Sequence, residues 1–146
     1  MKFDWLNSSK HQTVLTVGRV LTVGLPELGI TELAAKVDTG AFSGSLHAYD
    51  IREVTTADGT PQLQFKPADK NHEVVSISIY HRRNVKSSNG QISDRYAFET
   101  MIEIMGQQYP ITISLSDRSS MKYQMLIGRK FLKTHGFLVD VSLNNQ

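Results

Sequence analysis

The feature that most constrains the fold is a succession of short apolar runs, rich in β-branched residues and separated by turn signals. In EVVSISIY, residues 73–80, apolar and polar residues alternate, as in a strand that buries one face. Asp58-Gly59 and Asn89-Gly90 are dipeptides typical of tight turns. Many short strands at close spacing predict a mostly β domain rather than a helical bundle.

The same pattern divides the chain into an arm and one domain. Residues 1–12 are polar and are expected to form an N-terminal arm, followed by a single domain over 13–146. One short late helix is expected over 129–135, ended by Gly136. The expected strands are a hairpin over 13–24 that turns at Gly18, then 31–38, 46–54, 62–66, 73–80, 95–105, 108–115, 123–127 and 137–141.

Composition excludes several classes of function. The 146 residues are 40% apolar and 21% charged, as in a globular domain. The absence of cysteine excludes disulfides, thiolate metal sites and a cysteine nucleophile. No apolar stretch reaches the ~18 residues of a membrane span, and MKFDWLNSSKHQ has no signal-peptide core, so we expect a cytoplasmic protein without membrane contact. The net charge of +2 is too small to indicate direct nucleic-acid binding.

One acidic residue stands directly after an apolar run, in KVDTGAFSGS, residues 36–45. Taken alone, Asp38-Thr39-Gly40 is a turn, since Asp accepts local N–H groups and Gly tolerates positive φ. A second element lies far downstream, where an apolar run ends at Gly128 and leads into Arg129-Lys130-Phe131-Leu132. By itself, Gly128 marks only a strand boundary.

Together, VDTGA and LIGRKFL resemble the retropepsins, the single-domain aspartic proteases. The resemblance implies a retropepsin-like, closed β-barrel with one short late helix. It also implies that Asp38 is the catalytic residue. The residues that it implies as active-site support are Thr39, Gly40, Ala41, Ile127 and Gly128.

A closer resemblance covers nearly the whole chain. LPELGI, KVDTGA with SxLHA, RxVKSSNG and LSDRSSMKYQMLIGR are similar to a bacterial and archaeal retropepsin-like family that carries the label "ATP-dependent zinc protease". That family is linked with ATP-grasp ligases that add glutamates to ribosomal proteins, and some members are described as proteases that trim such tails. The resemblance implies a glutamate-tailed protein substrate and an ATP-grasp glutamate ligase as candidate partner. This chain departs from the pattern at Phe42, where relatives often have Arg.

Neither zinc nor ATP follows from the residues of this chain. There is no HExxH pair and no P-loop, and the histidines lie far apart without the short spacing of metal ligands. We therefore expect no cofactor and no metal site. The label of the family keeps a metal-dependent peptidase open as an alternative.

Aspartic chemistry needs two carboxylates that share one proton, one to activate water and one to protonate the leaving nitrogen. The chain has a single Asp-Thr-Gly, and the nearest imitation, Asp117-Arg118-Ser119, lacks the glycine. A two-fold symmetric homodimer would place Asp38 opposite its twin. The Thr39 hydroxyl could then bond across the axis, and Gly40 could aim its N–H at the carboxylate.

A polar segment between two apolar runs is a candidate lid over the cleft. Residues 82–95 contain the Asn89-Gly90 turn and set four bases against one acid, Asp94, and Arg118 and Arg129 are candidates to add to this charge. Basic groups around a cleft favour an acidic peptide, whereas the alternative is an ordinary solvated turn. The candidate substrate-binding residues are Arg82, Arg83, Lys86, Asn89, Gly90 and Arg95. His47 either faces the cleft or is structural, and the structural role is the better supported.

The sequence thus predicts a homodimeric aspartic peptidase that hydrolyses acidic, glutamate-tailed proteins. Besides the metal-dependent peptidase, two alternatives stay open. One is a non-catalytic peptide-binding module with the same fold, and the other is a regulator that docks on a glutamate ligase.

Overall fold

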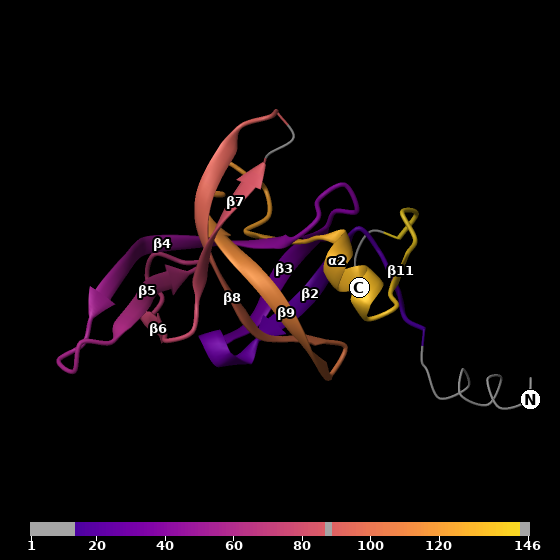
Figure 1. The fold of residues 1–146 in the computed structure, drawn as a ribbon. Coiled ribbons are helices and arrows are strands. Elements are labelled where there is room, and N and C mark those ends of the chain that lie inside the picture. Colours follow the sequence, from indigo (N-terminus) through magenta and orange to yellow (C-terminus); the bar gives the residue numbers. More distant parts are fainter. Residues whose placement is uncertain (1–13, 87–88, 144–146) are drawn as a thin grey trace, which may run out of the picture.

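The computed structural model describes residues 14–86 and 89–143. The predicted arm over 1–12 lies outside this range, so the proposed division into an arm and a domain remains a prediction. The fold is mostly β, with one short α-helix late in the chain (Figure 1). In the described part of the chain, no helix is long and apolar enough to cross a membrane.

Six strands pair in a ring. β10 is parallel to β3 and antiparallel to β4, so this three-residue strand closes the ring by pairing with a strand on each side. The ring-like, mostly β architecture with a late helix confirms the predicted fold class. In order around the ring, the strands are β10 (Met125–Ile127), β3 (Ile30–Val37), β2 (Val20–Leu25), β8 (Ile92–Ile104), β9 (Gln107–Ser116) and β4 (Gly44–Thr55).

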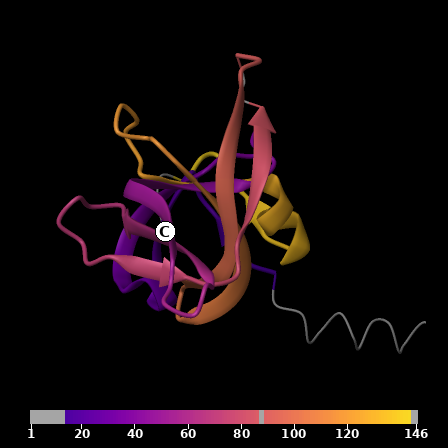
Figure 2. The same ribbon diagram turned by 60° about the vertical axis from the view of Figure 1, so that its left-hand side comes forward.

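Smaller elements extend the ring. β4 continues beyond it and pairs with β5 (Pro61–Pro67), which pairs with β6 (Val75–Ile77). β7 (His81–Lys86) pairs with β8, and Figure 2 shows this two-stranded hairpin projecting away from the ring. The remaining elements are β1 (Thr16–Val17), the 3₁₀ turn η1 (Pro26–Leu28), α2 (Arg129–Thr134) and β11 (Leu138–Val139).

The core follows from the period-two pattern of the strands. Apolar side chains that alternate along a strand all point to one face, and here that face is the inside of the ring. α2 packs through Phe131, whose ring meets Phe137 and Tyr109 edge-on. The largest fully buried side chains include Leu21, Leu46, Phe65, Phe98, Ile102, Ile113, Met125 and Ile127.

Four elements differ from the sequence-based expectations. Residues 13–24 do not form a hairpin: β1 pairs with β11, and β2 pairs with β3 and β8. Strand 73–80 shortens to β6, and the last strand shortens to β11. The polar residues 81–86, which were not among the expected strands, form β7 because a complete ladder to β8 satisfies their backbone groups.

Candidate active site

Asp38 lies directly after β3, at the point where that strand runs beside β10. Its N–H donates to the carbonyl of Ile127 at 2.9 Å, and its carboxylate accepts the N–H of Gly40 at 3.0 Å. Asp38 is half-buried, whereas Thr39 and Gly40 are exposed. The loop thus presents an oriented carboxylate, that of Asp38, next to the exposed side chain of Thr39.

The second motif, the segment around Gly128, holds the Asp38 loop through backbone hydrogen bonds. The N–H groups of Arg129 and Lys130 donate to the carbonyls of Ala41 and Phe42, at 2.8 and 3.0 Å. The Arg129 guanidinium adds a bond to the carbonyl of Gly40 at 3.1 Å. The structure therefore brings the two sequence motifs into direct contact.

Gly128 is required by this contact. A Cβ atom at this position would lie 2.6 Å from the carbonyl oxygen of Phe42, and the obstacle is backbone that cannot swing aside. Any side chain would push the Asp38 loop away from β10. Gly128 thus supports the loop by allowing close approach of the two chain segments.

The β7–β8 hairpin stands on the same side of the ring as loops 38–43 and 117–124 (Figure 1). In its register, Arg83 lies opposite Arg95, and Arg82 lies opposite Tyr96. Residues directly opposite in an antiparallel pair share a face, and successive residues alternate. The predicted basic lid is therefore divided between two faces: Arg83 and Arg95 on one, and Arg82 and Lys86 on the other.

We call these faces the inner and the outer face. The inner face is that of Arg83 and Arg95; Arg83 lines a pocket of about 210 Å³ together with Ser43, Gly44 and Lys130, next to the Asp38 loop. Asn89 and Gly90 lie at the tip, where Gly90 has φ 88° and Asn89 accepts the N–H of Gln91.

On the outer face, Arg82 is engaged in a polar cluster. Its guanidinium donates to the Tyr96 hydroxyl at 2.9 Å and lies 3.3 Å from Asp94. The hydroxyls of Tyr96 and Tyr80 both donate to Glu53. These hydrogen bonds lower the pKa of Glu53, and the Glu53 carboxylate raises the pKa of Tyr80 to about 12. The structure therefore points Arg82 toward β4 and away from Asp38.

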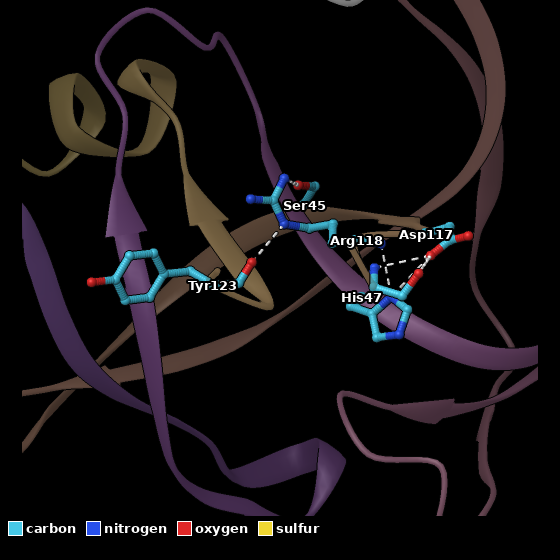
Figure 3. A network of polar contacts seen from close by, with 6 residues as sticks. Ser45, His47, Asp117, Arg118 and Tyr123 are labelled. Carbon is cyan, nitrogen blue, oxygen red and sulfur yellow. Dashed lines mark hydrogen bonds and ion pairs between the residues drawn. The ribbon is translucent and has the colours of Figure 1, made fainter. Parts of the chain in front are cut away.

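Arg118, in the loop between β9 and β10, also belongs to this region. Its Nε donates to the carbonyl of Tyr123 at 3.0 Å, and one terminal nitrogen donates to the Ser45 hydroxyl at 3.4 Å (Figure 3). Burial and the nearby Arg95 lower the pKa of Arg118, while the charge of Asp38 raises it. The Arg118 side chain thus lies within electrostatic reach of both Arg95 and Asp38.

His47 is a structural residue. It is 2% exposed, and its Nδ1 accepts the backbone N–H of Arg118 at 2.8 Å (Figure 3). Its Nε2 lies buried without a hydrogen-bond partner. His47 therefore fixes the backbone of Arg118 instead of facing a cleft, in line with the better supported of the two roles.

Comparison with known proteins assigns the chain to a family. The family described as retropepsin-like aspartic endopeptidase RimB matches residues 16–146. The chain belongs to this RimB-like family. A crystal structure of a Legionella pneumophila protein of unknown function (DUF785) has a similar fold, with a TM-score of 0.74, 27% identity, and coverage of 92% of this chain and 98% of that protein.

Other relatives of this RimB-like chain carry a different name. A probable alpha-L-glutamate ligase of Shewanella halifaxensis is 35% identical over 122 residues, and one of Parasynechococcus marenigrum is 30% identical over 121 residues. The match covers 80% of this chain but only 26% of each relative. The RimB-like chain therefore corresponds to about a quarter of the length of these ligases.

The zinc in the label of the resembling family has no matching ligand set here. Within residues 14–86 and 89–143, no three His, Asp or Glu side chains are close enough together to hold a metal ion. We derive no step through a metal.

The structure brings together most of the residues that the sequence nominated. Asp38, Thr39, Gly40 and Ala41 lie against the Ile127–Gly128 segment. The sequence named Arg118 only as an addition, with Arg129, to the basic charge around the cleft, and not among the candidate substrate-binding residues. Its half-buried position follows from the path of the loop, which no local pattern indicates.

Proposed function

We propose that this RimB-like chain is an aspartic endopeptidase that acts as a homodimer on acidic protein substrates. The observation that carries the proposal is the Asp38 loop: an oriented carboxylate, held from below by β10 and the start of α2, beside an exposed threonine. A surface carboxylate with this support suits a two-fold axis, on which its twin supplies the second acid.

In the proposed reaction, one Asp38 carboxylate takes a proton from water as the water oxygen bonds to the carbonyl carbon of the peptide. The Asp38 of the second copy, in its protonated form, holds the carbonyl oxygen. The C–N bond then breaks as a proton passes to the leaving nitrogen. Thr39 would bond across the axis and hold the two acidic loops together against their repulsion.

Acidic substrates are supported by charge. Arg83, Arg95 and Arg118 all lie on the side of the Asp38 loop, and basic groups around a cleft attract negative peptides. The names of the curated relatives point the same way, since a glutamate ligase makes the kind of chain that such a cleft would hold. A poly-glutamate tail on a protein is therefore the substrate that we propose.

The test compares wild type with Asp38→Asn on a glutamate-tailed peptide. Asp69→Asn is a matched control, because Asp69 is an exposed aspartate that likewise accepts the N–H two residues ahead. We expect cleavage by wild type and the control and none by Asp38→Asn. Equal cleavage by all three proteins would overturn the aspartic mechanism.

The dimer can be tested in the same assay. When wild type and Asp38→Asn are mixed in equal amounts, random pairing leaves about one quarter of the dimers with two carboxylates. Cleavage at constant total protein should then fall to about one quarter of the wild-type rate. A fall to one half would mean that each chain works alone.

A second candidate function is supported by the coverage of the relatives. Because the matching part is a quarter of a glutamate ligase, the domain could instead bind the acidic product for a ligase without cleaving it. Wild type and Asp38→Asn would then bind a glutamate peptide equally, and neither would cleave it.

A further inference from the structure

Two arginines from separate segments of the chain lie within electrostatic reach of each other, and one of them, Arg118, lies within reach of Asp38. Arg95 lies on the inner face of β8, and Arg118 lies in the loop that follows β9. Both are half-buried, and neither forms an ion pair with an acidic side chain in residues 14–86 and 89–143. Burial lowers the pKa of both guanidiniums, and the charge of Arg95 lowers that of Arg118 further.

Such an arrangement is unfavourable for the empty protein. Two like charges that have lost part of their water repel each other, and the acidic charge that acts on Arg118 within residues 14–86 and 89–143 is that of Asp38. An added anion would reduce the repulsion between the two arginines and would also replace the water that they have lost. On the outer face, the opposite holds, because Arg82 already has Asp94 as its partner.

Arg118 is also held in one orientation. Nε and one terminal nitrogen are bound by Tyr123 and Ser45, and the backbone N–H is bound by His47 (Figure 3). A guanidinium has five N–H donors in a rigid plane, so donors remain for a ligand after these contacts. A planar carboxylate is the anion that this geometry fits best.

We propose that Arg118 and Arg95 form a carboxylate subsite beside Asp38, which makes the site specific for a glutamate side chain next to the bond that is cleaved. This inference rests on the proposed function and deepens it. Arg118 is the specificity-determining residue, and Arg95 closes the subsite from the hairpin. Ser45, Tyr123 and His47 are positioning residues, since they act only through Arg118.

The test uses two peptides that differ at one position next to the cleaved bond, with glutamate in one and glutamine in the other. A charge-assisted hydrogen bond predicts that wild type prefers the glutamate peptide by about tenfold to a hundredfold in kcat/KM. In Arg118→Gln this preference should disappear, mainly through a higher KM for the glutamate peptide. Arg95→Gln should reduce it, and Arg118→Lys should retain part of it.

Arg52→Gln is the matched control. Arg52 is an exposed arginine that contacts Gln64 in the β4–β5 ladder. We expect it to keep the full preference. An equal loss on both peptides in Arg118→Gln would show a structural role only and would overturn the subsite. An unchanged preference in Arg118→Gln would overturn it as well.

A binding assay separates this inference from the proposed function. Both peptides, labelled with a fluorophore, are titrated into Asp38→Asn and into Asp38→Asn with Arg118→Gln, and anisotropy is measured. Preference for glutamate in the first protein and none in the second supports the subsite even if wild type cleaves nothing. No preference in the first protein overturns the subsite even if wild type is an active protease.

Discussion

The two faces of the β7–β8 hairpin come from the same two strands but differ in their electrostatics. On the outer face, Arg82 contacts Asp94 and Tyr96, and Tyr96 in turn contacts Glu53. On the inner face, Arg83 and Arg95 lie opposite each other, and neither makes an ion pair within the described residues. Arg82 on the outer face is neutralised by its neighbours, whereas Arg83 on the inner face shares its pocket with Glu99 but forms no ion pair within the described residues.

The difference shows that the position of a charge matters more than its number. Four bases against one acid, counted along the segment, describe a uniformly basic hairpin. Strand alternation sends every second side chain to the opposite face, so only part of this charge can act on a ligand at the Asp38 loop. The predictions below test this division, starting with the largest effect.

The largest effect is expected for a substitution at Gly128, which contacts the Asp38 loop. In Gly128→Ala, the new Cβ would collide with the carbonyl of Phe42, so the Asp38 loop must move away from the end of β10. We expect loss of cleavage and a free energy of unfolding lower by about 1–3 kcal/mol, measured by urea denaturation. Gly59→Ala is the control for activity, because its Cβ meets nothing within 4 Å and the positive φ of 86° strains the turn between β4 and β5 instead of the Asp38 loop. It should remain active, and an active Gly128→Ala would contradict the contact.

The second effect concerns salt. If unpaired charge on the inner face attracts acidic peptides, kcat/KM should fall several-fold as ionic strength rises from about 0.01 to about 0.15 M, since the Debye length shrinks from about 30 to about 8 Å. Arg83→Gln should flatten this dependence more than Arg82→Gln does. Identical salt curves for the two variants would mean that the faces do not differ in function.

The third effect tests the outer cluster. The Glu53 carboxylate raises the pKa of Tyr80 to about 12, so Glu53→Gln should lower the pKa of this tyrosine toward 10. Ultraviolet titration of tyrosinate in both proteins measures the shift, and Tyr80→Phe identifies the group. Because the pKa is raised in the folded state, this contact stabilises the fold below about pH 10. That contribution should disappear as the pH rises toward 12.

The smallest effect is expected for Arg82→Gln. Its ion pair with Asp94 is solvent-exposed, with 61% and 52% of the two side chains accessible, and such pairs contribute little to stability. The urea midpoint and the Glu/Gln preference should both stay close to those of wild type. A preference lost in Arg82→Gln would place the outer face in the substrate site.

Much of the fold could be predicted because its signals are local. Asp58-Gly59 does form a turn, with φ 86° at the glycine, and Gly106 turns the chain between β8 and β9. The strand that ends at Asp38 and the short helix after Gly128 were also expected from residue patterns. The polar strand β7 was missed because its partner strand, and not its own apolar pattern, makes it a strand.

The sequence by itself determined the strand-rich class, the main turns and the pair of motifs around Asp38 and Gly128, since each depends on neighbouring residues. Tertiary structure alone decided which charged side chains lie near these two motifs. Arg95 and Arg118 are separated by the whole of β9, and the β8–β9 pairing and the loop after β9 bring them to one place. Electrostatic interactions depend on distance in space, and a chain that folds back on itself sets those distances through pairings that no short segment encodes.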